Sequence, residues 1–231
     1  MHTDHVRARD GIRLATDIHL PDGAGPFPVI LERTPYGRDQ TSRSELTAAD
    51  PNPASRAELA AYFNQAGYAV VYQDTRGRHG SEGKFEKYLA DGEDGFDTCA
   101  WLVGQHWCDG RICTMGLSYA AHTQAALGCL DPPGVVAQVL DCGGFCDSWQ
   151  AGIRQSGAFE LKQATWAHKQ AILSPEAEAD PVMRAALESE DIRDWFMRMP
   201  WKPGHSPLRH HPDYEAYLFA QWTHGARDEF W

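Results

Sequence analysis

The sequence predicts an α/β fold, in which a mostly parallel sheet is followed by a helical C-terminal segment. Short apolar runs typical of buried strands, such as Val29–Leu31 and Val135–Leu140, alternate with segments of helical length over the first 146 residues. This alternation implies parallel strands joined by right-handed crossovers. Beyond residue 146, Val and Ile become scarce, and six of the eight tryptophans lie there. We therefore expect a sheet domain over 1–146 and a helical cap over 147–231.

The N-terminal part contains two predicted strands, 5–9 and 12–20. The second strand alternates between an apolar and a polar face, which is the pattern of a half-buried strand. A loop rich in Gly and Pro then leads to the buried strand Val29–Leu31, and a polar segment rich in turn-forming residues covers 34–53.

The next elements continue the alternation. Ser55 is the predicted N-cap of a helix over 56–65, which Gly67 terminates. A buried strand is expected over 68–73, and a helix with acidic residues in its first turn over 91–105. The remaining predicted elements are a glycine-containing loop over 76–84, strands over 110–115 and 135–140, and helices over 119–127, 157–172, 175–189 and 212–222.

Composition limits the class of function. The net charge of -11 disfavours a nucleic-acid partner. The sequence shows neither an apolar leader nor a run long enough to span a membrane, so we expect a cytoplasmic protein without a membrane partner. The six cysteines form no CxxC pair, which favours reduced core thiols over a metal site. No cofactor or metal is expected.

The segment Gly116–Ala121 carries the strongest chemical signal. Ser118 lies between a predicted strand and a predicted helix and is flanked by small residues. A sharp turn of this kind, the nucleophile elbow, presents a serine hydroxyl above the end of a parallel sheet. The alternative is an ordinary serine at a helix N-cap.

A nucleophilic serine also needs donors that stabilise the oxyanion. The backbone N–H of Tyr119, the residue after the serine, is the first expected donor. The second should come from the loop after Val29–Leu31, where Pro35 and Gly37 flank Tyr36, whose phenol can donate. The alternative for Tyr36 is a packing role.

Several unusual motifs occur in the order found in one family of α/β-hydrolases, which includes X-Pro dipeptidyl-peptidases, cocaine esterases, α-amino-acid ester hydrolases and glutaryl acylases. The chain resembles this family from about residue 5 to its C-terminus. The motifs are Arg9-Asp10-Gly11 with Leu14-Ala15-Thr16-Asp17, Arg33-Thr34-Pro35-Tyr36-Gly37, Gln73-Asp74-Thr75-Arg76-Gly77-Arg78 with Ser81-Glu82-Gly83, Trp107-Cys108-Asp109-Gly110-Arg111, and Gly116-Leu117-Ser118-Tyr119. The fragment Gly157-Ala158-Phe159-Glu160 resembles the start of the family's cap.

The resemblance implies a role for four residues. Ser118 is the nucleophile, the Tyr36 hydroxyl and the Tyr119 N–H form the oxyanion hole, and Trp166 resembles a cap residue near the acyl pocket. The sequence departs from the family at Ala120 and Ala121, where the family usually has glycines.

A larger departure concerns the catalytic acid and histidine, which follow the serine in this fold. The family continues from a segment like Asp228–Trp231 into the strand that bears the acid, then the histidine and a jelly-roll domain. We therefore expect an incomplete sheet and a sequence that is truncated before both residues.

A histidine within this sequence could instead act as the general base. His122 follows Ser118 by one helical turn, and His79 lies in the glycine-containing loop. Four histidines of the predicted cap could pair with Asp213 or Asp228, although solvated surface histidines are the more economical interpretation for all six. The four are His205, His210, His211 and His224. Asp74 and Arg76, after a strand end, are interpreted as a structural ion pair, and Asp91, Glu93 and Asp94 as charges at a helix start.

The sequence thus predicts a serine hydrolase that cleaves ester or amide bonds in a small molecule or short peptide through an acyl-Ser118 intermediate. The alternative is a catalytically incomplete hydrolase fragment or a binding module. In either case a second chain, or a second copy, could complete the sheet.

Overall fold

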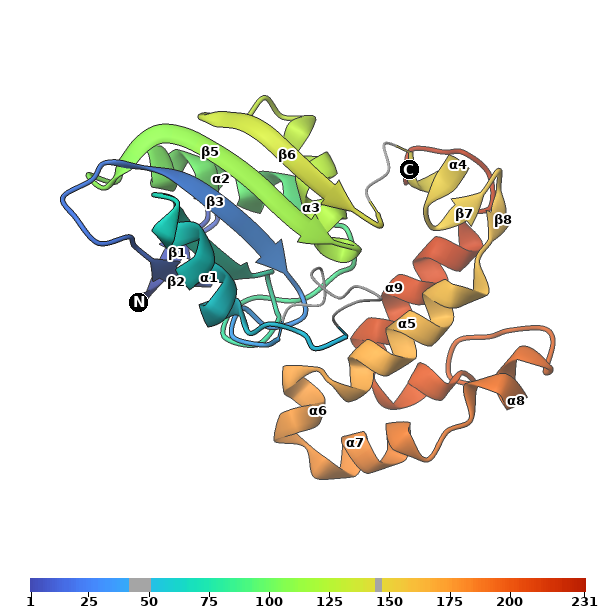
Figure 1. Cartoon of the computed structure of the whole chain (residues 1–231). Coiled ribbons are helices and arrows are strands. Elements are labelled where there is room, and N and C mark those ends of the chain that lie inside the picture. Colours follow the sequence, from blue (N-terminus) through green and yellow to red (C-terminus); the bar gives the residue numbers. More distant parts are fainter. Residues whose placement is uncertain (42–50, 144–146) are drawn as a thin grey trace. The chain divides into compact units, whose positions relative to one another are not determined.

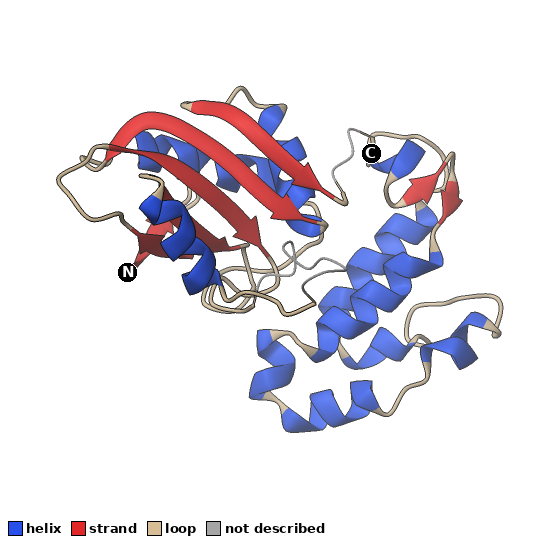
Figure 2. Cartoon of the chain, in the orientation of Figure 1, coloured by secondary structure: helices blue, strands red, loops and turns tan. Residues whose placement is uncertain are grey.

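The computed structural model describes residues 1–41, 51–143 and 147–231, which divide into two compact units, Met1–Gly144 and Phe145–Trp231. The first unit contains the sheet, and the second is mostly helical (Figure 2). Among the described residues, no helix combines the length and apolar character needed to cross a membrane.

The described part of the first unit forms one six-stranded sheet in the order β1-β2-β4-β3-β5-β6 (Figure 1). β4, β3, β5 and β6 are parallel, whereas β1 pairs antiparallel with β2, and β2 antiparallel with β4. This mixed, mostly parallel sheet confirms the predicted α/β class. The strands are β1 (His2–Arg7), β2 (Arg13–His19), β3 (Phe27–Thr34), β4 (Ala69–Asp74), β5 (Cys108–Leu117) and β6 (Val135–Asp141).

Helices cover both faces of this sheet: α1 (Arg56–Gln65) lies on one face, and α2 (Asp91–Val103) and α3 (Tyr119–Gly128) lie on the other (Figure 1). Side chains of a strand point alternately to its two faces. In β4, Val70 and Tyr72 accordingly pack with the α1 side, whereas Ala69 and Val71 belong to the core beneath α2 and α3.

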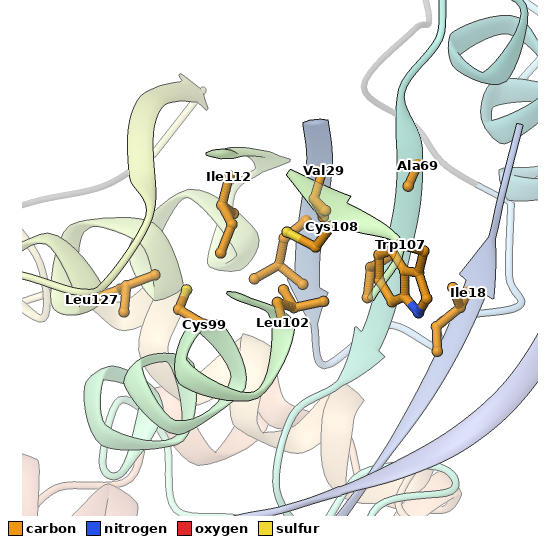
Figure 3. Packing of buried hydrophobic residues seen from close by; sticks show 11 residues of the cluster. Ile18, Val29, Ala69, Cys99, Leu102, Trp107, Cys108, Ile112 and Leu127 are labelled. Atoms are coloured by element: carbon orange, nitrogen blue, oxygen red, sulfur yellow. The ribbon is translucent and has the colours of Figure 1, made fainter. Parts of the chain in front are cut away.

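The larger core lies between the sheet and the pair α2 and α3 (Figure 3). Its side chains come from four strands, two helices and the residue before β5, so it ties segments distant in sequence to one another. Burying apolar area at about 25 cal/mol per Å² makes such a cluster a main source of stability. The buried members are Ile18, Val29, Leu31, Ala69, Val71, Cys99, Leu102, Trp107, Cys108, Ile112 and Leu127.

The start of α1 shows how local sequence sets an element. The Ser55 hydroxyl accepts a bond from the Glu58 N–H at 3.2 Å, and the Glu58 carboxylate accepts one from the Ser55 N–H at 2.7 Å. This reciprocal pair, a capping box, satisfies two donors at the helix end. The predicted N-cap and the predicted helix over 56–65 are both confirmed.

The prediction of a buried strand over 135–140 is wrong. β6 lies at the edge of the sheet, and Val136, Val139 and Leu140 are 62%, 64% and 43% exposed. Val135 alone of its apolar side chains packs against the larger core. An apolar run predicts a strand but does not reveal that the strand lies at an edge.

The expectation of core cysteines holds for only part of the set. Cys99 and Cys108 are buried free thiols, and Cys113 is half-buried. Cys129 and Cys142 are exposed, because one follows the last turn of α3 and the other follows the exposed strand β6. The sixth, Cys146, lies outside the described residues.

The second unit consists of short helices and one small hairpin. The predicted helix over 175–189 is two helices, with a break at Asp180, which caps the second one before Pro181. The elements are α4 (Ser148–Ala151), β7 (Arg154–Gln155), β8 (Ala158–Phe159), α5 (Leu161–Ile172), α6 (Pro175–Ala179), α7 (Pro181–Glu188), α8 (Ile192–Phe196), the 3-10 helix η1 (Pro207–His210) and α9 (Pro212–Thr223).

Candidate active site

Ser118 occupies the turn between β5 and α3 in a strained backbone conformation, with φ 61° and ψ −112°. Such a conformation costs about 1–3 kcal/mol for a residue other than glycine. Backbone bonds hold it: the Ser118 N–H donates to Asp141 O at 2.9 Å, and the Ser118 carbonyl accepts from the N–H of Ala121 at 3.1 Å. The side chain makes no helix-capping bond and the residue is exposed, so Ser118 is not an ordinary N-cap.

Small residues are required where strand and helix meet. A Cβ added to Gly116 would lie 2.4 Å from the Cβ of Ala120, and one added to Gly143 would lie 2.5 Å from the Ser118 carbonyl oxygen. Positive φ falls on Gly116 and Ser118, whereas Ala120 and Ala121 belong to helix α3. The two alanines that depart from the family pattern therefore occupy positions that tolerate a Cβ.

Tyr36 lies beside Ser118. Its hydroxyl oxygen is 3.5 Å from Ser118 Oγ, at the outer limit of hydrogen bonding, so the phenol makes no strong bond to the serine. The Tyr36 N–H donates to Thr34 Oγ1 at 3.1 Å, and Gly37 turns the chain with φ 94°. Because β3 and β5 are parallel neighbours, their carboxyl ends bring the two residues to one edge of the sheet.

The last residue of β4 and the glycine-containing loop after it form a clamp that holds the Tyr36 loop. The Asp74 carboxylate accepts bonds from the Arg38 N–H at 2.7 Å and from Arg38 Nη1 at 2.6 Å. The carbonyl of Pro35 accepts a bond from Arg78 Nε at 3.2 Å and lies 3.1 Å from His79 Nε2. These supporting contacts are not predictable from the spacing of the residues, and the arginine-rich loop directly after a buried strand is the signal in the sequence that points to them.

The interpretation of Asp74 and Arg76 as a pair needs correction, since each has other partners. Asp74 pairs with Arg38, and Arg76 pairs with Asp94 and Asp10, at 2.6 and 2.5 Å. Hydrogen bonds to these carboxylates raise the pKa of the Arg76 guanidinium.

Asp17, on the predicted polar face of β2, is buried, whereas Arg13 on the same face is exposed. Asp17, at 5% exposure, accepts a bond from the Thr3 hydroxyl at 2.6 Å and lies 3.1 Å from Arg38 Nε. Arg38 therefore joins carboxylates of β2 and β4, because β2 is an inner strand.

The Tyr119 side chain extends into the interior. Its hydroxyl accepts a bond from the Tyr88 N–H at 2.9 Å and is hydrogen-bonded to the Asp91 carboxylate. Burial raises the pKa of Asp91 to about 7, and burial together with the nearby Asp91 carboxylate raises the pKa of Tyr119. Asp91 is thus a buried carboxyl group, although it was predicted to be a simple charge at a helix start.

Two histidines predicted to be solvated are buried. His122 packs on the Tyr88 ring with centroids 4.0 Å apart, and burial lowers its pKa to about 4. A group of this pKa is a weak proton acceptor at neutral pH. His211, in the second unit, has its Nε2 3.1 Å from Ser174 Oγ.

In the second unit, His224 Nδ1 lies 2.8 Å from Asp228 Oδ2, and both side chains are about 40% exposed. This is one of the His–Asp pairs that the sequence left open. Trp166, the predicted acyl-pocket residue, is a half-buried member of α5 in the same unit. Of the predicted site residues, the first unit brings together Ser118, Tyr36 and Tyr119.

The chain is similar to known hydrolases over most of its length. A family model described as X-Pro dipeptidyl-peptidase (S15 family) matches residues 10–231. Cocaine esterase from Rhodococcus sp. (strain MB1 Bresler) is 42% identical over 119 residues, which cover 52% of this chain and 19% of that protein. The chain spans about a fifth of the length of the curated relatives it matches.

Solved structures show the same fold. A CocE/NonD family hydrolase from Staphylococcus aureus has a TM-score of 0.66 at 22% identity, covering 99% of this chain and 37% of that one. An aminopeptidase from a marine sediment Thaumarchaeota archaeon has a TM-score of 0.56 at 27% identity, covering 74% of this chain and 30% of that one. The family-model match confirms the resemblance inferred from the sequence motifs, and the solved structures confirm the fold.

Proposed function

Since this chain belongs to the X-Pro dipeptidyl-peptidase (S15) family, we propose that it is a serine hydrolase that cleaves ester or amide bonds through an acyl-Ser118 intermediate. The names of the family and of its relatives support the class of serine hydrolase, esterase or peptidase. The observation that carries the proposal is the exposed, strained Ser118 with the Tyr36 hydroxyl 3.5 Å from its Oγ.

In the proposed reaction, Ser118 Oγ attacks the carbonyl carbon of the substrate as its proton passes to a general base. The oxygen that becomes negative is stabilised by the Tyr36 O–H and the Tyr119 N–H. As the first residue of α3, Tyr119 has an N–H that points out of the helix end. Collapse expels the alcohol or amine, which takes up the proton, and water then hydrolyses the acyl-serine.

The base and its acid partner are a separate part of the proposal. The low pKa of His122 makes it a poor base. We propose that another segment or a partner chain supplies the histidine and the acid, consistent with the small share of its relatives that this chain spans.

The substrate proposal is an ester, amide or short peptide, and Trp166 is a proposed substrate-binding residue. The match to cocaine esterase favours an ester as the substrate.

Hydrolysis of p-nitrophenyl acetate tests the proposal. The expected result, once the segment or partner chain that supplies the base is present, is turnover by the wild type that disappears in Ser118→Ala. Ser156→Ala is the matched control, because Ser156 is also exposed and also has a positive φ of 48°. Turnover retained in Ser118→Ala, or equal loss in both variants, would reject Ser118 as the nucleophile.

One observation favours the second candidate, a binding module. The edge strand β6 exposes Val136, Val139 and Leu140, and an exposed apolar edge can pair with another chain. Sedimentation of the wild type and of Val139→Lys tests this: a binding module that associates through β6 should dissociate in the variant.

A further inference from the structure

Beneath the candidate oxyanion hole lies a buried carboxyl group with no role in the reaction described above. Asp91 is 4% exposed and opens helix α2, and its carboxylate is hydrogen-bonded to the hydroxyl of Tyr119. The second carboxylate oxygen, Oδ2, is buried without a hydrogen-bond partner. A buried, incompletely satisfied carboxylate costs free energy, so its presence calls for a physical explanation.

The backbone around Asp91 is strained in a way that delivers the carboxyl group to this position. Tyr88 and Ala90 have positive φ values of 70° and 60°, an uncommon conformation for residues other than glycine. Arg33 Nη1 donates to the Asp91 carbonyl at 2.5 Å, which fixes the helix start from strand β3. Gly95 leaves room for this guanidinium, since a Cβ there would lie 2.8 Å from Nη1.

Tyr119 is therefore held at two places. Its backbone follows Ser118 directly, and its hydroxyl is gripped between the Tyr88 N–H and the Asp91 carboxylate. Hydrogen bonds to an ionised acceptor are roughly twice as strong as neutral ones. A firm hold on the phenol limits rotation of the residue that carries the oxyanion-binding N–H.

We propose that Asp91 is a positioning residue, whose ionised carboxylate anchors the Tyr119 phenol and so orients the Tyr119 N–H for the reaction at Ser118. This inference rests on the proposed function. Protonation of Asp91 weakens the anchor, so oxyanion binding is expected to become weaker as the pH falls through the titration of Asp91.

Burial and the charges around Asp91 place its titration in a pH range that can be reached with the folded protein. Burial raises its pKa to about 7, while the Arg33 charge and the Tyr119 hydroxyl favour the ionised form and Asp94 opposes it. A cavity of about 300 Å³ adjoins the group. The ionisable residues that line it are Arg76, Lys84, Glu86, Asp91 and Tyr119.

An NMR titration tests the inference without requiring catalysis. The full chain is labelled with ¹⁵N-tyrosine, and the Tyr119 amide is identified as the one of eight tyrosine signals that Tyr119→Phe removes. We expect this signal to shift with a midpoint near pH 7 in the wild type and not in Asp91→Asn. An amide that does not titrate, or that titrates equally in Asp91→Asn, would overturn the inference.

The rate of Ser118 labelling by a fluorophosphonate gives the functional readout. Losing a charge-assisted bond predicts that Asp91→Asn reacts about fivefold more slowly than wild type at pH 8.5, with a ratio near one at pH 5.5. Because a general base common to both proteins titrates equally in each, its effect cancels in the ratio of the two labelling rates. A ratio that does not change with pH indicates a merely structural role and would contradict the inference.

Glu93→Gln is the matched control, because it removes one negative charge from the same helical turn at an exposed position. It should leave both the amide titration and the labelling ratio unchanged. Labelling of a serine other than Ser118 contradicts the proposed function, whereas the amide titration still decides whether Asp91 controls Tyr119.

Discussion

The side chains of Tyr36 and Ser118 come within 3.5 Å of each other although 82 positions separate them in the sequence. Each follows the carboxyl end of a strand, and β3 and β5 are parallel neighbours in the sheet. The phenol donor and the serine hydroxyl therefore lie side by side, where both can contact one substrate carbonyl group. The proposed chemistry depends on this relationship.

Replacing Tyr36 by Phe should remove one oxyanion donor and keep the ring. Loss of such a donor lowers kcat about 10²–10³-fold, with little effect on folding. The measurement is kcat for p-nitrophenyl acetate together with the thermal midpoint. Tyr62→Phe is the control, because Tyr62 is 68% exposed. An unchanged kcat in Tyr36→Phe would assign this tyrosine to packing.

Gly143→Ala should disturb Ser118 directly. The added Cβ would lie 2.5 Å from the Ser118 carbonyl oxygen, so the serine backbone must shift. Overpacking of this kind costs about 1–3 kcal/mol, and fluorophosphonate labelling should fall at least tenfold.

Gly104→Ala provides the comparison for Gly143→Ala, since its nearest neighbour would be 3.4 Å away, an ordinary contact. Labelling is measured at equal fractions of folded protein. Equal rates in the two variants would show that the serine tolerates displacement.

Asp74→Asn should loosen the loop that carries Tyr36. Asp74 is fully buried and pairs with Arg38 at 2.6 Å, and breaking a buried pair costs about 3 kcal/mol. We expect a lower unfolding free energy and a labelling rate reduced about tenfold.

Asp39→Asn removes an exposed carboxylate from the same loop and should change neither quantity. If Asp74→Asn destabilises the protein but labels at the wild-type rate, the clamp supports the fold without positioning Tyr36.

Asp91→Asn should stabilise the protein, and more at high pH. Because the folded-state pKa of Asp91 is raised to about 7, folding binds a proton between roughly pH 4 and pH 7, and wild-type stability falls as the pH rises through this window. From pH 5 to pH 8 the Asn variant should gain about 3 kcal/mol relative to wild type.

Urea unfolding at the two pH values measures this difference. A gain that is the same at pH 5 and pH 8 would mean that Asp91 ionises normally in the folded protein.

The sequence predicted those elements well whose boundaries are set by contacts between residues close together in the chain. Ser55 and Glu58 determine the start of α1 by bonds within one turn, and small residues around Ser118 indicate the close approach of strand and helix. Both features can be read from a short segment of sequence.

Features that depend on long-range neighbours could not be predicted in this way. Asp17 belongs to a polar face by periodicity, but Arg38 reaches it because β2 is an inner strand. Asp91 lies in an acidic segment of the kind that begins a helix. Its burial against Tyr119 depends on how α2 packs on α3. Val139 has the character of a core residue, and its exposure depends on the edge position of β6.

The central claim is that Ser118 is a nucleophile activated by its surroundings. The most direct measurement is mass spectrometry of the full chain after treatment with a fluorophosphonate, followed by peptide mapping. The account predicts a single adduct on Ser118 in the wild type, strongly reduced in Tyr36→Phe. An adduct on another serine, or equal labelling of Ser118 in the wild type and in Tyr36→Phe, would contradict it.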